Sequence, residues 1–451
     1  MTTVDRKVAE LRHKLAGIDA DFARWRDETG PGRTLRKHRT QVVRLTDRLG
    51  GVVERIGAEL DAVATDGDDV LRECRRLQLR MLEVHRLWDF YRSKLNLRYV
   101  DWYRPFLTAV DEFAWLCYAP AAAGSDREAP LVHLSGEFSP FTHLRETPFA
   151  VEDVPDALDT TDFLGVVTRL PIPIIGLPWY QLVHLPDATV IAHEVGHAVE
   201  RDFELLGTVR ALTRPVFTTM PEARRDAWDT WLPEVFADLY AVLAAGPAFV
   251  SALADLLVVE PARMAAEVAA GAPVLVHPPA PVRLALTATA LAATGFTAAA
   301  DEVRRSWPTA CGPYEADIAP MTTALLDGRY PGLGDRPLRA VISFTAAQQA
   351  NAVTAADGLV DHQRPETSDV RSLVAAARLA FDRQPALFAP PPPGEVNAQD
   401  LILDKVAKAV GDGSRAGEDE RAPAVDDRAA GAELYDLMDK MISEAHDDHH
   451  D

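Results

Sequence analysis

The chain has 451 residues, of which 47% are hydrophobic and 25% are charged, and its formal net charge is −21 at pH 7. This length is sufficient for two or three domains, and the composition is that of an ordinary globular protein. The negative charge excludes a general nucleic-acid binder, because phosphates would be repelled over most of the surface.

The cysteines and the apolar stretches indicate a cytoplasmic protein. Cys74, Cys117 and Cys311 are far apart and form no CxxC pair, which is typical of reduced thiols. The first residues are charged and contain no apolar signal core. The longest apolar stretches, 248–259 and 284–300, fall short of the roughly 20 apolar residues that cross a bilayer. We therefore expect a soluble chain with no membrane partner.

Residues 1–120 are predicted to form a helical amino-terminal domain. Apolar residues recur at three- and four-residue intervals on both sides of a break at residues 30–32, which read Gly-Pro-Gly. The helical pattern continues from Val70 to Tyr118 and becomes rich in aromatic residues, which are more typical of a core or an interface than of a ligand pocket. These helices are also the predicted surface for a protein partner.

Residues 121–390 are predicted to form the second domain. Residues 131–185 lack helical periodicity, and the prolines of the stretch Leu170–Trp179 favour an extended strand at a sheet edge, where a peptide substrate can pair. Residues 187–389 read as mostly helical. The sequence 391–451 is acidic and rich in Gly and Ala, which predicts a largely disordered tail with a short helix near 433–444. The fold class is therefore α+β and predominantly helical, with a small mixed sheet.

The sequence His193-Glu194-Val195-Gly196-His197 is the strongest chemical motif. Positions i and i+4 share one face of a helix, so both imidazoles can reach a single cation. Glu194 can then face a water molecule at the metal without being a ligand. Apolar residues flank the motif, and we expect its helix to begin near residue 186 and to end at residue 207.

A pair of acidic residues farther along the chain offers a candidate for the third ligand. Glu234 and Asp238 are again i and i+4, on an apolar helix that is predicted to start at Pro233 and to end at residues 246–247. Two acids on a buried face are costly unless positive groups meet them. Zn²⁺ would meet Glu234, and the N–H group of a ligand histidine would meet Asp238. An exposed acidic helix face is the alternative interpretation.

These motifs resemble those of the gluzincin zinc peptidases, in which the Glu of Glu-x-x-x-Asp is the third zinc ligand. The segment 277–284, which reads His-Pro-Pro-Ala-Pro-Val-Arg-Leu, is similar to one in the CAAX prenyl proteases and their bacterial heat-shock relatives. The likeness covers roughly residues 165–290. It implies a zincin-like catalytic domain with an active-site helix, and it places Arg283 and His277 near the site as residues that assist catalysis. Those relatives are usually embedded in membranes, whereas no spanning helix is expected here.

The expected activity is zinc-dependent hydrolysis of a peptide or protein substrate, with Glu194 as the general base. His277, Arg283 and Tyr314 are candidates for stabilising the oxyanion. Two alternatives remain open. One is a zincin-like module that binds or regulates a partner through its amino-terminal helices without proteolysis. The other is a helical scaffold that binds no metal.

Overall fold

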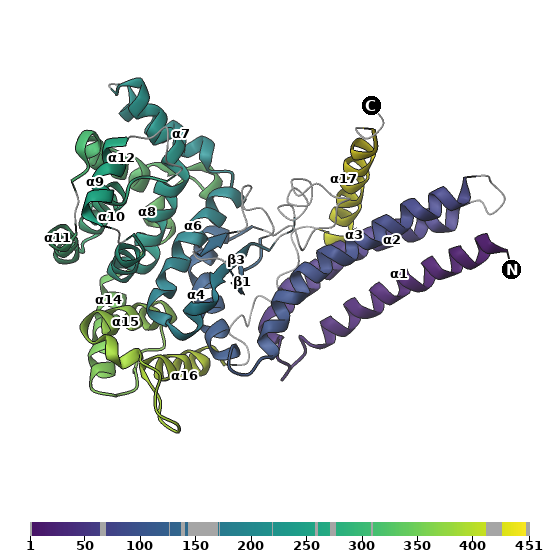
Figure 1. Ribbon diagram of the computed structural model, residues 1–451, viewed down its shortest axis with the longest axis horizontal. Coiled ribbons are helices and arrows are strands. Elements are labelled where there is room, and N and C mark those ends of the chain that lie inside the picture. Colours follow the sequence, from purple (N-terminus) through teal and green to yellow (C-terminus); the bar gives the residue numbers. More distant parts are fainter. Residues whose placement is uncertain are drawn as a thin grey trace.

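The computed structural model spans residues 1–451. The residues that it describes are all those outside 1, 64–68, 126, 137–139, 143–169, 171, 219, 258–259, 271–276, 308–309, 412–425 and 448–451. Within this part of the chain the protein is predominantly helical and contains a small mixed sheet (Figure 1). This composition of elements agrees with the predicted α+β, mostly helical class.

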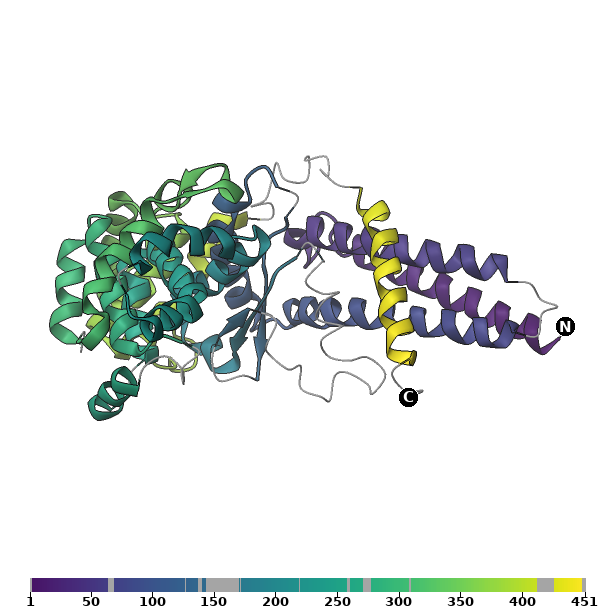
Figure 2. The ribbon, with the colours of Figure 1, turned by 90° about the horizontal axis from the view of Figure 1, so that it is seen from above.

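Three long helices form a bundle that extends away from the rest of the molecule (Figures 1 and 2). They are α1 (Thr3–Asp27), α2 (Arg39–Ala62) and α3 (Val70–Asn96). Apolar residues at helical spacing, such as Leu11 and Leu15, face a hydrophobic core that the three helices share. The break predicted at residues 30–32 separates α1 from α2.

The carboxyl-terminal helix α17 (Asp427–Asp447) crosses α2 on the side of this bundle (Figure 2). Glycine permits the close approach of the two helices, because a Cβ atom on Gly51 would lie 2.2 Å from the carbonyl oxygen of Arg428. A Cβ atom on Gly431 would lie 2.1 Å from the carbonyl oxygen of Arg48. The backbones of α2 and α17 are therefore in direct contact.

The tail after residue 390 contains α16 (Ala398–Val410), which the sequence analysis did not predict, and α17, which begins earlier than the short helix predicted at 433–444. Helix α16 buries Leu401 and Ile402 in the main core, and α17 buries Leu434 against the bundle. The sequence signal was present in both cases, since each helix carries an apolar stripe. The predicted helix at 433–444 lies within α17.

The other helices form a compact body around a second, larger hydrophobic core. Helix α4 (Arg104–Ala122) belongs to this body, so the two cores meet between α3 and α4 and not at residue 120. The remaining helices of the body are α6 (Ile191–Asp202), α7 (Leu206–Phe217), α8 (Glu222–Leu257), α9 (Pro261–Ala270), α10 (Ala280–Ala293), α11 (Thr297–Ser306), α12 (Glu315–Asp327), α13 (Leu338–Val341), α14 (Ala346–Val360) and α15 (Val370–Arg383).

A buried set of polar contacts joins the bundle to the body. The Arg98 guanidinium donates to both carboxylate oxygens of Asp111 on α4, at 2.8 Å each, and these two side chains are only 2% exposed. His38, which precedes α2, places its Nε2 atom 3.5 Å from Asp111, and Lys37 lies 3.2 Å from Glu112. The joint therefore pairs buried charges that would otherwise be costly.

The sheet corrects the prediction of an edge strand near residue 174. Strand β3 (Ile174–Pro178) lies between β1 (Leu131–Ser135), its parallel partner, and β2 (Phe141–Thr142), its antiparallel partner. A central position is possible because Pro173 precedes the paired segment and Pro178 ends it, so neither interrupts the ladder. Of these described strands, β2 is the edge strand that packs against α6. A second sheet pairs β4 (Arg329–Tyr330) with β5 (Arg336–Pro337).

Two predicted helix boundaries are also wrong. Helix α6 ends at Asp202 and not at residue 207. Glu204, two residues later, has a positive φ of 51°, and Gly207 lies inside α7. Helix α8 begins at Glu222, well before Pro233, and Gly246 interrupts its helical geometry with a φ of 60°. By length and composition α8 could cross a membrane, contrary to the sequence expectation, but 78% of its most apolar stretch is buried inside the fold.

Candidate metal centre

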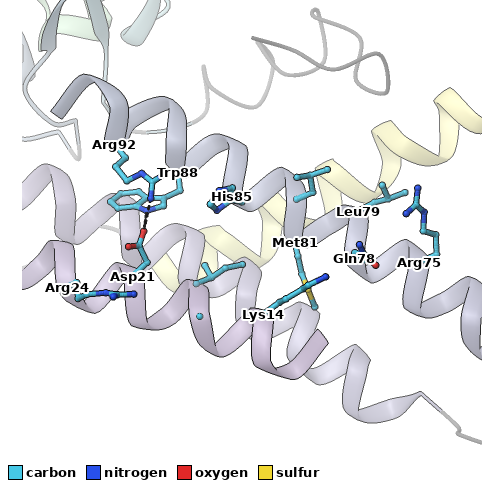
Figure 3. Close-up of a pocket in the computed structure, with 13 residues that line it drawn as sticks. Lys14, Asp21, Arg24, Arg75, Gln78, Leu79, Met81, His85, Trp88 and Arg92 are labelled. Atoms are coloured by element: carbon cyan, nitrogen blue, oxygen red, sulfur yellow. Dashed lines mark hydrogen bonds and ion pairs between the residues drawn. The ribbon is translucent and has the colours of Figure 1, made fainter. Parts of the chain in front are cut away.

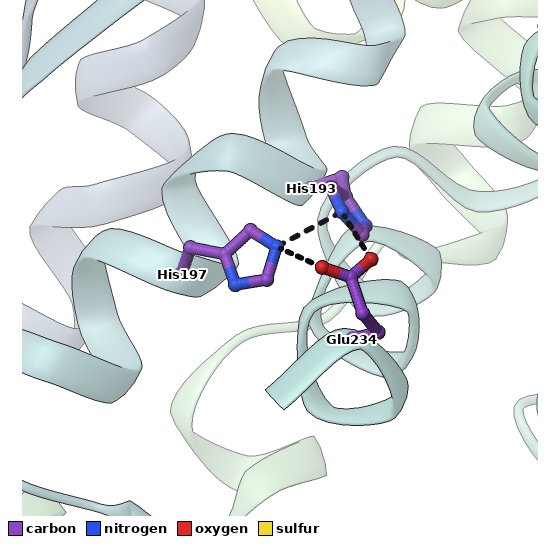
Figure 4. Close-up of side chains that lie close together, drawn as sticks. All are labelled: His193, His197 and Glu234. Atoms are coloured by element: carbon purple, nitrogen blue, oxygen red, sulfur yellow. Dashed lines mark hydrogen bonds and ion pairs between the residues drawn. The ribbon is translucent and has the colours of Figure 1, made fainter. Parts of the chain in front are cut away.

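Two neighbouring helices bring together the three predicted metal ligands (Figure 4). His193 and His197 lie one turn apart on α6, and Glu234 faces them from α8. The Nε2 atoms of the two histidines are 3.1 Å apart. The Glu234 carboxylate lies 3.4 Å from Nε2 of His193 and 3.2 Å from Nε2 of His197. Two imidazoles and one carboxylate therefore converge on one point.

The spacing of these atoms fits a small divalent cation. In a tetrahedral zinc site with bonds of about 2.0–2.1 Å, two ligand atoms lie about 3.3 Å apart. The two Nε2 atoms and the nearest carboxylate oxygens are close to that spacing, with Oε2 of Glu234 nearest to His193 and Oε1 nearest to His197. One ligand atom from each of the three residues lies within 4.8 Å of the others. Two histidines and a glutamate are also a ligand set that catalytic zinc sites use, with one position left for water or substrate. The residues present thus fit zinc, although the same donors suit other first-row metals.

Asp238 lies on the far side of His193 from the three converging atoms. Its Oδ1 atom is 2.8 Å from Nδ1 of His193. The Arg283 guanidinium, from α10, binds the same carboxylate through two hydrogen bonds of 2.8 and 2.7 Å. A neutral His193 with its proton on Nδ1 would leave Nε2 available for a metal. Arg283 and Asp238 are thus placed to fix the orientation and tautomer of His193.

Charges at the centre are strongly coupled. Burial alone would lower the pKa of His193, but the hydrogen bonds with Asp238 and Glu234 outweigh it and raise the pKa to about 10. Burial opposes ionisation of Glu234, yet His193 and His197 hold the pKa of this carboxyl well below its usual range. Burial likewise opposes ionisation of Asp238, and Arg283 with His193 keeps its pKa low. Without metal, these groups form a network of charged pairs.

Gly196 is a residue of the site that the sequence analysis did not single out. A Cβ atom at this position would lie 2.8 Å from the Cα atom of Ala237 on α8. Helices α6 and α8 therefore touch through two small residues, one inside each motif. This contact brings Glu234 within reach of both histidines. The signal was visible in the sequence as small residues in the middle of both motifs, but their pairing depends on tertiary structure.

The other predicted site residues lie at different distances from the three converging side chains. Glu194 is buried on α6. Burial lowers the pKa of the Arg283 guanidinium, but Asp238 outweighs it and, with smaller contributions from Glu234 and Glu194, raises that pKa. His277 lies 3.5 Å from the Glu234 carboxylate and is 61% exposed, so it stands at the open side of the centre. Tyr314 is buried and its ring packs against Trp228 and Trp231, which makes it part of the core.

No protein-family model matches the sequence, and no curated protein or solved structure matches it either. The resemblance to gluzincin peptidases remains a prediction from the sequence motifs.

Proposed function

We propose that the chain is a zinc-dependent hydrolase of peptide bonds with a gluzincin-type site. The observation that carries the proposal is the convergence of His193, His197 and Glu234, each of which offers one ligand atom within 4.8 Å of the others. The proposal places a zincin-like catalytic unit in the body of the molecule, around α6 and α8. It also keeps the cytoplasmic location and the peptide or protein substrate that the sequence predicts.

Each residue of the centre has a distinct role in this proposal. When bound, zinc supplies Lewis-acid chemistry, because it polarises a carbonyl group and makes water more acidic. Glu194 accepts the proton of the attacking water and passes it to the nitrogen of the leaving amine. Its position next to His193, without membership of the ligand set, suits this role. His277, at the open side, is placed to donate a hydrogen bond to the substrate carbonyl oxygen.

Arg283 acts through Asp238 and not on the substrate. Its guanidinium is already engaged by the two hydrogen bonds to Asp238, and it lies 3.7 Å from the Glu234 carboxylate. It therefore balances the negative charge of the acids and positions His193, whereas the sequence analysis named it as one of three candidates for stabilising the oxyanion. Removal of this charge would leave the buried Asp238 carboxylate without its arginine partner.

The test is cleavage of a fluorogenic peptide library by the zinc-loaded full-length chain, compared with the Glu194→Gln variant. The variant keeps the ligand set, so it should bind zinc normally. Its rate should fall on the order of 10²–10⁴-fold, because the general base is lost. Equal rates in the two proteins, each with one zinc ion, would contradict the proposed hydrolase.

A second candidate is a zincin-like module that binds a partner through α1, α2 and α3 and does not cleave it. The open groove between α1 and α3 favours this candidate. Partner binding and hydrolysis, each measured after removal of metal, distinguish the two candidates. A binding module would retain its partner after removal of metal and would show no hydrolysis, whereas the hydrolase would lose activity on removal of metal.

A further inference from the structure

A groove of about 550 Å³ runs between α1 and α3 on the helical bundle, away from the metal centre (Figure 3). Each wall is one face of a helix. The α1 wall is formed by residues three and four positions apart, from Lys14 through Gly17 and Ile18 to Arg24. The α3 wall extends over about 25 Å, from Arg75 to Arg92, at 1.5 Å per residue. The shape is thus long and narrow, and it follows the helix axes.

The floor of the groove is apolar. Met81 and Trp88 are buried beneath it, and Ile18 packs partly against the same core. Leu82, which also lines the groove, is 42% exposed. Gly17 adds space, because a Cβ atom at this position would meet no atom within 4 Å. The exposed Leu82 and the apolar floor are therefore where apolar side chains of a partner would make contact.

The rim of the groove is basic although the whole chain carries a charge of −21. Four cationic residues line it: Lys14, Arg24, Arg75 and Arg92. Lys14 already pairs with Glu10, and Arg92 pairs with Asp89, so Arg24 and Arg75 supply most of the positive charge that a partner would meet. Asp21 is the one carboxylate among the lining residues. It accepts a hydrogen bond of 2.6 Å from the Trp88 indole and lies 3.4 Å from Arg92. The groove therefore favours a partner with negative charge beside an apolar surface.

Another face of the same bundle already binds a helix that has acidic and apolar residues. Helix α17 is buried there through Leu434 and Met438, and its Asp427 carboxylate receives hydrogen bonds from two arginines of α2. These bonds are 2.9 Å from Arg44 and 3.0 Å from Arg48. The bundle thus binds an acidic amphipathic helix on one face with arginine and apolar contacts. The groove between α1 and α3 offers the same combination on a face that no described helix covers.

We propose that the groove between α1 and α3 binds an amphipathic helix of a partner protein, with an apolar stripe along the floor and carboxylates facing the basic rim. The α3 wall has room for roughly 17 helical residues at 1.5 Å each. This mode of recognition anchors a helix by residues spaced at i, i+3, i+4 and i+7. The inference does not depend on hydrolysis and would stand if the metal centre were inactive.

The test uses the full-length chain and two labelled 18-residue peptides with the same leucine stripe, one flanked by Glu and the other by Lys. Fluorescence anisotropy should show binding of the Glu peptide at least tenfold tighter than that of the Lys peptide. Gly17→Leu should weaken binding of the Glu peptide by at least tenfold, because the new side chain fills the groove. It should not unfold the protein, since the position is open and leucine favours helix more than glycine does.

Gly57→Leu is the matched control, because Gly57 on α2 is also open and does not line the groove. It should leave binding unchanged. The double variant Arg24→Glu with Arg75→Glu should reverse the preference between the two peptides. Equal binding of both peptides, or full binding by Gly17→Leu, would overturn the proposal.

Two other occupants would also overturn it. One is a membrane surface, shown by binding to phosphatidylserine vesicles that Gly17→Leu abolishes while the Glu peptide fails to bind. The other is a second copy of the chain, shown by concentration-dependent dimerisation that Gly17→Leu abolishes.

Discussion

Asp238 connects Arg283 to the candidate metal ligand His193 and is placed to determine which nitrogen of the imidazole would face a cation. The carboxylate accepts two hydrogen bonds from Arg283 and lies 2.8 Å from Nδ1 of His193. Partners of this kind are known to tune metal affinity through the orientation and basicity of the ligand. Residues outside the three candidate ligands are therefore expected to affect metal affinity.

Asp238→Asn should weaken zinc binding by about 10–100-fold, because the amide supports the required histidine tautomer less well. The affinity would be measured by competition with a chromophoric chelator. Asp187→Asn is a suitable control, since Asp187 pairs with Arg378 and His184 and contacts none of the ligands. Unchanged affinity in Asp238→Asn would show that the contact with His193 is incidental.

The protonation of His193 predicts a pH dependence of metal binding. Its pKa of about 10 in the metal-free protein is above the unfolded value of about 6.5. At pH 7 the ring is therefore protonated, and metal binding must release a proton. Zinc affinity should rise by up to about tenfold per pH unit below pH 10. Calorimetry in two buffers with different ionisation enthalpies should give close to one proton released from His193, and none would contradict the account.

The raised pKa of His193 also makes the folding stability of the metal-free protein depend on pH. A raised pKa stabilises the folded state fully below the unfolded value of about 6.5. This contribution is lost as the pH rises from about 6.5 through about 10. Glu234 and Asp238 have lowered pKa values and act in the opposite sense, since their contribution is lost as the pH falls through their folded pKa values.

At the scale of elements, the close packing of α6 on α8 determines whether the ligands meet. Gly196 leaves no room for a Cβ atom against the backbone of Ala237. Gly196→Ala should destabilise the protein by about 1–3 kcal/mol, the usual cost of overpacking, and should weaken zinc binding. Gly207→Ala on α7 is the control, because its position is open and stability should not fall. Thermal denaturation with and without zinc measures both effects.

The close crossing of α17 over α2 predicts that a larger side chain at Gly51 will detach α17. Gly51→Ala places a methyl group against the carbonyl oxygen of Arg428, so α17 should detach from the bundle. Hydrogen exchange of the amides in α17 should then become faster, while that of α6 should not change. Gly57→Ala, also on α2, should leave the protection of α17 intact. Unaltered exchange in Gly51→Ala would mean that the crossing tolerates a methyl group.

The sequence predicted the convergence of His193, His197 and Glu234 better than it predicted the surrounding elements, for physical reasons. Helical spacing alone places His193 and His197 on one face, and an apolar helix with two acids indicates a buried cation or base near Glu234. The position of β3 in the sheet was missed because pairing depends on strands elsewhere in the chain. The contact of Asp427 with Arg44 spans 383 residues, and no local pattern specifies such a partner.

At the scale of the whole molecule, the bundle and the body have separate hydrophobic cores that are joined by buried charges. Arg98→Met should destabilise the chain by about 3–5 kcal/mol, since it leaves the buried Asp111 carboxylate without its main partner. Arg12→Met should cost less than about 1 kcal/mol, because its pair with Asp61 is exposed. Denaturant unfolding would measure both. Similar losses in the two variants would show that the joint contributes little to stability.

The central claim is that one metal ion holds α6 and α8 together at His193, His197 and Glu234. The most direct measurement is the metal content of the purified full-length chain by mass spectrometry, alongside His193→Ala and Glu234→Ala. The account predicts about one zinc ion per wild-type chain and loss of the metal in both variants. A wild-type chain that takes up no zinc, even after reconstitution at neutral pH, would contradict it.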